Sequence, residues 1–362
     1  MTIRVLGIGT AVPEHALDQT LIAGLAKARC CQTDRQGRLL DSLYRSTEIR
    51  TRGSVLASVG EGAASEMPFY PLPSSPSDKG PSTAERMRRY ARESIPLALA
   101  AAKEALADAH LKPADITHLI TVSCTGFFAP GPDIALIKQL GLSPETARLH
   151  VGFMGCHGTL NALRQAQAIA AQPGTCVLIC AVELCTLHLQ YGWELNAVLS
   201  NSLFADGAAA LVIGNRKSEH SESWILAASG SCVLPDCEDA MTWTIGDHGF
   251  QMTLTKTVPN LIHKHLRPWL ETWLARYNQS VATVATWAVH PGGPRILSET
   301  ARALNLNPAA IAVSHDIMAA YGNMSSPTIV FIINQLRAEA SPRPCVALGF
   351  GPGLAVETAL FL

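Results

Sequence analysis

The stretch FMGCHGTLNALRQAQAIAAQPG, residues 153–174, sets a cysteine between glycines at the point where a helix should begin. We expect this helix over residues 157–171. A thiol at Cys156 would feel the positive end of the helix dipole and unpaired N–H groups, and both favour the thiolate. Gly155 and Gly158 would let a substrate approach the backbone closely. Cys156 is therefore a candidate nucleophile, and the alternative is a buried structural cysteine.

Short runs rich in Val, Ile, Leu and Ala, bounded by Gly or Pro, lie on both sides of this helix. Ala-rich helical patterns separate them, which is the rhythm of an α/β protein with buried strands. A second helix is expected over 97–110. The expected strands cover residues 3–9, 117–124, 176–183, 209–214, 223–229, 286–290, 344–350 and 354–362.

The pattern also suggests two similar halves. The polar stretch RKSEHSES, residues 216–223, is the best candidate for a boundary, and it gives an N-terminal half over 1–218 and a C-terminal half over 219–362. Each half ends in a glycine-led apolar run, DGAAALVIG (206–214) in the first and GPGLAVETALFL (351–362) in the second. This likeness suggests an internal duplication.

Segment 54–82 is dense in Gly, Pro and Ser, and we expect an exposed loop or the margin of a lid there. Ser82 to Glu85 form a capping box, and Pro96 fits the first turn of the next helix. The arginines that follow the capping box should form a solvated helix face: Arg86, Arg88, Arg89 and Arg92.

The composition is that of a well-buried globular protein. Of 362 residues, 48% are apolar and 16% are charged, which is enough to bury a large core in about two domains. A net charge of −1 gives no electrostatic footprint for nucleic acid or an anionic membrane. Any polyanionic partner must therefore be met by a local basic patch.

The cysteines and the N-terminus indicate the cytoplasm. Ten cysteines are scattered through apolar runs without metal-ligand spacing, which is typical of reduced thiols in a cytosolic protein. The apolar run after Met1 is too short for a secretory leader, and no stretch reaches the length of a membrane span. We expect a soluble intracellular protein with no metal.

A nucleophilic cysteine needs a group that stabilises its thiolate and donors for the oxyanion formed at a thioester. His290 ends an expected strand in TWAVHPGGP, and Asn323 lies in AYGNMSSPT before another helix. Each residue alone fits a structural role, as a hydrogen-bonded core histidine or a turn asparagine. In combination with Cys156 they form a candidate catalytic set.

Four motifs together resemble the type III polyketide synthases of the thiolase fold. GCHGTLNALRQA, HPGGP, YGNMSSPT and GFGPGLAVET match that family in order and at similar spacing, and the resemblance runs from GIGTAVP near the N-terminus to Leu362. The combination of GFGPG with GNMSSP is quite specific, whereas Cys, His and Asn alone also fit β-ketoacyl-ACP synthase III. Stretches such as VSCTGFFAPGPD look more like bacterial members than plant chalcone synthases.

The resemblance implies a thiolase-like layered αβαβα fold of two halves, a homodimer and a CoA-dependent acyltransferase. Cys156 would hold an acyl-CoA starter as a thioester, and His290 would pair with its thiolate. His290 and Asn323 would bind the malonyl-CoA thioester carbonyl while carbon dioxide leaves, so that decarboxylative Claisen condensation gives a pyrone- or resorcinol-type polyketide. No cofactor is implied beyond the CoA thioesters.

Other functions stay open at this point. A β-ketoacyl-ACP synthase III-like or HMG-CoA-synthase-like condensing enzyme would use the same three residues. A non-catalytic scaffold of the thiolase fold would have no need for a thiolate, so the intact set speaks against it.

The resemblance also identifies a substrate pocket. Phe204 matches the family's aromatic gatekeeper, whereas Met252 and Trp243 fall where chalcone synthases carry Phe and Gly, and His188 falls near a cavity-lining Thr. These departures argue against cyclisation of a bulky phenylpropanoid chain. The expected pocket residues are Phe204, Met252, Trp243, His188, Ser325, Gly351 and Gly353, and the expected contacts to CoA phosphates are Arg50 and Arg52.

Overall fold

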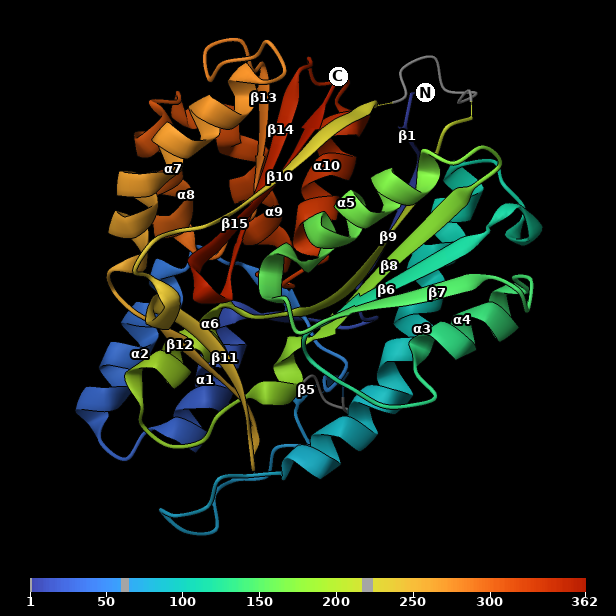
Figure 1. Ribbon diagram of the computed structural model, residues 1–362. Coiled ribbons are helices and arrows are strands. Elements are labelled where there is room, and N and C mark those ends of the chain that lie inside the picture. The colour runs from blue at the N-terminus through green and yellow to red at the C-terminus, as the bar shows by residue number, and fades with distance from the viewer. Residues whose placement is uncertain (1, 60–64, 217–223) are drawn as a thin grey trace.

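Two sheets of the same design form the centre of the protein (Figure 1). The computed structural model describes residues 2–59, 65–216 and 224–362, and the expected boundary between residues 218 and 219 lies outside them. The first sheet has, in order, β1 (Arg4–Ala11), β9 (Asp206–Gly214), β8 (Cys176–Leu184), β6 (His118–Ser123) and β7 (Ala147–Gly152). The second has β10 (Leu226–Val233), β15 (Ala355–Phe361), β14 (Cys345–Gly351) and β13 (Thr286–Val289).

The two sheets share their pairing pattern. In each, the first strand pairs antiparallel with the second, the second antiparallel with the third, and the third parallel with the fourth. This common order is what a duplicated half would give, since a repeated unit keeps its own strand connections.

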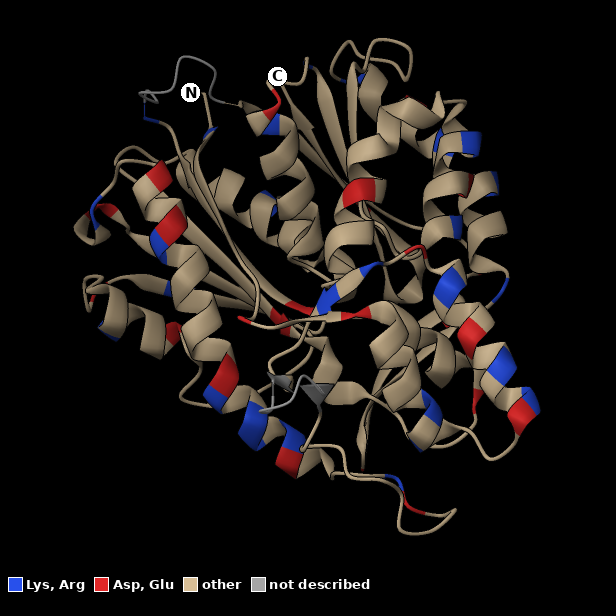
Figure 2. Ribbon diagram, turned by 180° about the vertical axis from the view of Figure 1, so that it is seen from behind, with Lys and Arg blue, Asp and Glu red and all other residues tan. Residues whose placement is uncertain are grey.

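Helices cover both sheets and fill the space between them (Figure 1). The outer face of the first sheet carries α3 (Thr83–Asp108) and α4 (Pro132–Leu140), and that of the second carries α7 (Val258–Ala275) and α8 (Pro294–Leu304). Between the sheets lie α5 (Gly158–Ala170), α9 (Ala312–Tyr321) and α10 (Thr328–Ala338). The predicted αβαβα layering is thus present, with charged residues mainly on the outer helices and loops (Figure 2).

Strand alternation explains the three layers of core. Leu178 and Cys180 of β8 point into the core beneath α3, whereas Val177 and Ile179 point into the core between the sheets. A strand buried on both faces has no polar alternation and appears in the sequence as a continuous apolar run.

A group of smaller elements lies at one end of the layers (Figure 1). It includes the helices α1 (Gln19–Cys30), α2 (Asp34–Ser46) and α6 (Leu195–Leu203) and the hairpin of β11 (Met241–Gly246) and β12 (Gly249–Leu254). Short pairs are formed by β2 (Ala16–Asp18) with β3 (Thr51–Gly53), and by β4 (Ser58–Val59) with β5 (Ser65–Glu66). Apart from β4 and β5, the described part of the predicted loop 54–82 has neither helix nor strand.

All eight predicted strands are confirmed, but the expectation for Pro96 is wrong. The capping box of Ser82 and Glu85 starts α3 as expected, and Pro96 lies inside this helix rather than at the first turn of another. Pro96 and Arg92 are both exposed, so water can bond the Arg92 carbonyl that proline leaves without a donor. Among the described residues, no helix is long and apolar enough to cross a membrane.

The close approach of β1 to α3 gives a stability test. A Cβ built at Gly9 would lie 2.2 Å from the Ala101 carbonyl oxygen, and neither backbone can move without disturbing a core layer. We expect Gly9→Ala to lower the free energy of unfolding by about 2–3 kcal/mol.

The matched control is Gly24→Ala in α1, where an added Cβ would meet nothing within 4 Å. This change should raise the free energy of unfolding by ~0.5–1 kcal/mol, because alanine favours a helix over glycine. Urea denaturation of both variants measures the difference, and equal midpoints would contradict the packing described.

Candidate active site

Cys156 lies in a short turn, η2 (Gly155–His157), that leads directly into α5. The helix predicted over 157–171 is confirmed to within one residue at each end. Gly155 has a φ of +78°, and a Cβ there would lie 2.4 Å from Cδ of Pro352. Glycine is therefore required at the turn that brings the buried Cys156 thiol to the N-terminus of the central helix.

The backbone of Asn323 is hydrogen-bonded to the residues before and after Phe204. Its N–H donates to the Leu203 carbonyl at 3.0 Å, and its carbonyl accepts from the Ala205 N–H at 2.9 Å. The side-chain oxygen accepts the Ser325 N–H at 2.8 Å, which leaves the amide N–H groups to donate elsewhere. The side chains of Asn323 and Ser325 both lie within hydrogen-bonding reach of the Cys156 sulfur.

His290 follows β13 and is almost fully buried. Its N–H donates to the Leu348 carbonyl at 2.8 Å, and continuing the pairing of Val289 with Leu348 places it beside Gly349 of β14. Neither ring nitrogen has a hydrogen-bond partner. Buried imidazole nitrogens are usually bonded, so this ring is free to bond a substrate.

Burial controls the ionisation of this pair. It raises the pKa of the Cys156 thiol to about 11, and the hydrogen bonds from Ser325 and Asn323 lower the pKa only in part. Burial also lowers the pKa of His290 to about 3, and the neighbouring His157 lowers it too. The expectation of a thiolate favoured at rest is therefore wrong, because the effect of burial on the Cys156 pKa outweighs these hydrogen bonds, and both groups are neutral.

Glu183 is a fully buried carboxylate that sequence reasoning missed. It accepts hydrogen bonds from the Cys124 N–H at 2.9 Å, from Thr125 Oγ1 at 2.6 Å and from Ser326 Oγ at 2.6 Å. These bonds join the loop after β6 to the loop that carries Asn323, on either side of Cys156. A single acidic residue within the apolar run CVLICAVELC, 176–185, was the signal that could have identified it. Among the described residues, no group of three or more His, Cys, Asp or Glu side chains could hold a metal ion.

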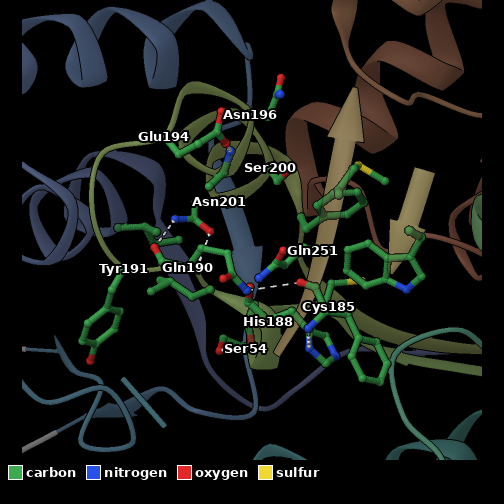
Figure 3. Close-up of a pocket in the computed structure, with 18 of the residues that line it drawn as sticks. Ser54, Cys185, His188, Gln190, Tyr191, Glu194, Asn196, Ser200, Asn201 and Gln251 are labelled. Atoms are coloured by element: carbon green, nitrogen blue, oxygen red, sulfur yellow. Dashed lines mark hydrogen bonds between the residues drawn. The ribbon is translucent and has the colours of Figure 1, made fainter. Parts of the chain in front are cut away.

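Two cavities meet at a wall beside Cys156. The inner cavity has a volume of about 20 Å³ and is lined in part by Cys156, Ser325 and Pro352. The outer cavity has a volume of about 460 Å³ and lies on the other side of this wall. Glu194, Asn196 and Ser200 lie at one end of it, and Cys185 and His188 lie at the other (Figure 3). Four side chains line both cavities and form the wall between them: Cys185, Phe204, Trp243 and Met252.

Trp243 and His188 form a rigid part of this region. Trp243 pairs with Met252 across the β11–β12 hairpin, and its indole N–H donates to the Cys124 carbonyl at 2.8 Å. The His188 ring stacks on Phe250 with centroids 4.2 Å apart. Its Nε2 bonds the Thr125 carbonyl at 2.8 Å and its Nδ1 accepts the Phe250 N–H at 3.0 Å, so the proton is on Nε2. Burial lowers the pKa of His188 to about 3, and it is a neutral wall residue.

The remaining predicted pocket residues surround the nucleophile turn. Ser325 has a φ of +56°, and its Oγ lies 3.4 Å from Sγ of Cys124. Gly351 and Gly353 flank Pro352, and a Cβ at Gly351 would lie 2.4 Å from Cδ2 of His157. The glycine-rich loop therefore packs directly on η2.

The expectation that Arg52 contacts CoA phosphates is wrong. Arg52 is 3% exposed, and its guanidinium donates to the side-chain oxygen of Gln19 at 2.9 Å and to the Phe204 carbonyl at 2.6 Å. It is a structural cation that holds the backbone of the wall. Arg50 is exposed, and the structure gives it no part in the cavities that contain or adjoin Cys156.

Arg86 likewise departs from its expected solvated position. It is fully buried, and its Nη1 donates to the carbonyls of Leu187 and Leu189 at 2.7 and 2.9 Å. These carbonyls flank His188, so Arg86 fixes the chain that carries this wall residue. Charge alone in the sequence did not distinguish it from its solvated neighbours.

A third cavity of about 240 Å³ is lined by residues close in sequence to the catalytic candidates. Gly292 and Gly293, which follow His290 and Pro291 in the sequence, line it, and so does Leu203, directly before Phe204. Lys256 and Arg295 supply positive charge to its lining. Sequence reasoning missed both cations because they lie in separate segments.

Comparisons with known proteins agree with this arrangement. The family model of the chalcone and stilbene synthase N-terminal domain matches residues 2–217, and that of the C-terminal domain matches residues 225–362. The alpha-pyrone synthesis polyketide synthase-like Pks18 of Mycobacterium tuberculosis is 34% identical, over 76% of this chain and 72% of its own length. The 1,3,6,8-tetrahydroxynaphthalene synthase of Streptomyces peucetius is 30% identical, over 98% of this chain and 92% of its own.

Solved structures give the same result. The polyketide synthase PKS-I of the brown alga Ectocarpus siliculosus superposes with a TM-score of 0.91 at 29% identity, and covers 99% of this chain and 98% of its own. The C-terminal type III polyketide synthase domain of Steely1 from Dictyostelium gives a TM-score of 0.90 at 27% identity, and covers 100% of this chain and 99% of its own. With both halves matched by family models and the full set of layers shared, the chain belongs to the chalcone and stilbene synthase family, the type III polyketide synthases.

Proposed function

We propose that this acyltransferase condenses malonyl-CoA onto an acyl-CoA starter held on Cys156. The observation that carries the proposal is the convergence at the Cys156 sulfur. Asn323 and Ser325 lie within hydrogen-bonding reach of it, and His290, which lies near His157, has two unpartnered ring nitrogens. A second cavity lies behind one wall.

Loading begins with a neutral thiol and a neutral imidazole. The Cys156 sulfur attacks the carbonyl carbon of the acyl-CoA thioester while its proton moves to His290. The new sulfur–carbon bond forms, the bond from that carbon to CoA sulfur breaks, and His290 returns the proton to the departing CoA sulfur. Because burial disfavours charge on both groups, the proton transfer occurs together with the attack rather than before it.

Condensation uses the same donors. As malonyl-CoA loses carbon dioxide, negative charge develops on its thioester oxygen, and the N–H groups of His290 and Asn323 stabilise this enolate. The enolate carbon then attacks the acyl carbonyl carbon on Cys156, and the cysteine sulfur leaves as a thiolate, which takes up a proton from water to restore the neutral thiol. The buried surroundings strengthen these hydrogen bonds by excluding water.

The third cavity is the best entrance for CoA. Lys256 and Arg295 would offer charge-assisted hydrogen bonds to phosphates, and Gly292 and Gly293 let a pantetheine arm pass close to the backbone toward His290. These two cations replace Arg50 and Arg52 as the proposed phosphate contacts.

The outer cavity is the proposed place for an aliphatic starter chain. Its inner end is apolar, and Met252 in the wall is slim and flexible enough to open a route from Cys156. Trp243 adds bulk beside the site where the growing chain must fold, which favours few extensions and a pyrone over a resorcinol. The names of two relatives give different products, an alpha-pyrone for one and a tetrahydroxynaphthalene for the other.

The alternative is a condensing enzyme that takes malonyl from a carrier protein, as a β-ketoacyl-ACP synthase III-like enzyme would. The basic lining of the third cavity would also suit an acidic carrier.

We further propose a cytoplasmic location with no metal or additional cofactor. The location rests on the ten cysteines scattered through apolar runs without metal-ligand spacing.

The first test measures the reaction itself. The protein is incubated with malonyl-CoA and a panel of short, long and aromatic acyl-CoAs, and product masses are read. Cys156→Ala should lower product formation by on the order of 10³-fold or more and abolish acyl loading, while slow malonyl decarboxylation persists because the oxyanion donors remain.

Cys232→Ala is the matched control, since Cys232 is partly exposed on β10 and outside the site. Turnover that requires a malonyl-carrier protein and fails with malonyl-CoA would favour the alternative.

The second test concerns product length. Trp243→Gly removes an indole that lines both cavities, so products should shift toward additional malonyl units. A Trp243 that merely packs would instead give a loss of about 3–5 kcal/mol in stability with an unchanged product pattern. Melting temperature and product masses measured on the same sample separate these outcomes.

The third test concerns the homodimer that we propose. β7 is the edge strand of its sheet, and Leu149 on it is 42% exposed, with Phe127 and Met154 exposed to 39% and 40%. An edge strand that exposes an apolar side chain is a common place for association. Leu149→Arg should reduce the mass from two chains to one in light scattering, whereas Leu72→Arg, at a site 65% exposed in the 54–82 loop, should not. A monomeric wild type would exclude the dimer.

A further inference from the structure

We infer that His157, the residue after the nucleophile, is a positioning residue that sets the size of the inner cavity and thereby the number of extensions. The inference rests on the proposed condensation, because it concerns the length of that reaction's product. The mechanism does not use this side chain. His157 is buried, and its Nε2 has no hydrogen-bond partner.

The His157 ring lies against the glycine-rich strand end of the second sheet. A Cβ built at Gly349 would lie 3.0 Å from Cβ of His157, and one built at Gly351 would lie 2.4 Å from Cδ2 and 2.5 Å from Nε2 of the ring. Residues 349 and 351 point to the same face of β14. The imidazole therefore occupies the space that a side chain at position 351 would take, whereas a side chain at position 349 would meet Cβ and Cα of His157.

Pro352 connects this contact to the site. It lines the inner cavity together with Cys156, and its Cδ would be 2.4 Å from a Cβ at Gly155. The nucleophile turn and the glycine-rich loop are thus interlocked at two points, Pro352 over Gly155 and His157 over Gly351. A substitution that changes the packing of His157 therefore also moves Pro352. Pro352 lines one side of a cavity of only about 20 Å³.

A hydrogen bond fixes the orientation of the ring. The Nδ1 of His157 bonds Oδ1 of Asn161, one turn along α5, at 2.7 Å. Burial lowers the pKa of His157, and the Glu357 and Arg164 side chains near it form their own ion pair at 2.7 Å. The ring is therefore an uncharged spacer with a defined tilt, held by packing and one bond.

Removing the spacer should enlarge the cavity. In His157→Ala the Gly351 backbone can settle toward α5 and carry Pro352 away from Cys156, so the cavity holds a longer chain before release. We expect the ratio of longer to shorter products to rise about threefold or more. His157→Phe keeps the bulk of the ring, and it should retain a product ratio close to that of the wild type.

A compensating pair makes the experiment specific. Gly351→Ala alone drives a Cβ into the His157 ring and should disrupt the loop, whereas the double variant His157→Ala with Gly351→Ala refills the space and should bring the product ratio back toward the wild type. Coupling of this kind is expected of residues in contact and absent between independent sites. A general loss of stability would not reproduce it.

Product masses are measured for the four variants with one starter, with acyl loading of Cys156 and melting temperature recorded in parallel. If His157→Ala melts near the assay temperature, His157→Val takes its place, because valine keeps more of the packing than alanine does and still removes the imidazole ring. An unchanged product ratio in a folded Ala or Val variant, or no compensation in the double variant, overturns the inference. A wild type that forms no condensation product with any acyl-CoA overturns the proposed function instead.

Discussion

The buried carboxylate of Glu183 is the interaction on which the arrangement of the site depends. It is fully enclosed, and it bonds Cys124, Thr125 and Ser326, which belong to loops from the two sheets. A buried carboxylate that lost these donors would carry a large desolvation penalty, so the loops are held to it strongly. The Cys124 carbonyl then receives the Trp243 indole, and Ser326 follows the residues that face Cys156. One acidic group thus determines the distance between the wall and the nucleophile.

Neutrality is the second general feature of the site. Burial raises the pKa of Cys156 and lowers the pKa values of His290 and His188, so these hydrogen-bonding groups carry no net charge on the thiol or the two rings. Such a pocket discriminates against stable ions and favours charge that appears only during reaction, which is the condition for lowering a barrier rather than tightening ground-state binding. Two cationic side chains, Lys256 and Arg295, line a separate cavity that neither Cys156 nor His290 lines.

The sequence predicted the layers of the fold better than the surroundings of the cavity wall. Apolar runs such as 176–183 identify strands buried on both faces, and Gly155 and Gly158 identify the start of α5, because these patterns depend on local backbone geometry. β7 was missed because most of it is exposed and lacks such a run. Arg52 and Arg86 look like surface cations in the sequence, and only tertiary structure shows that each serves carbonyl oxygens around the wall. The neutral state of Cys156 was likewise unpredictable, because desolvation depends on segments far away in the chain.

The shared design of the two sheets has a consequence for how activity can arise. The first sheet and its helix α5 supply Cys156, while His290 and Asn323 come from the half built on the second sheet. Asn323 reaches the Cys156 sulfur, and His290 lies near His157, the residue after the nucleophile. Neither sheet with its helices supplies all three candidate residues, so docking of the two parts assembles the candidate site and does not merely protect it. Such an arrangement links catalytic competence to correct folding. An intermediate in which one half alone is ordered presents a thiol without its partners, and reactive thioesters meet a working site only after the whole chain has folded.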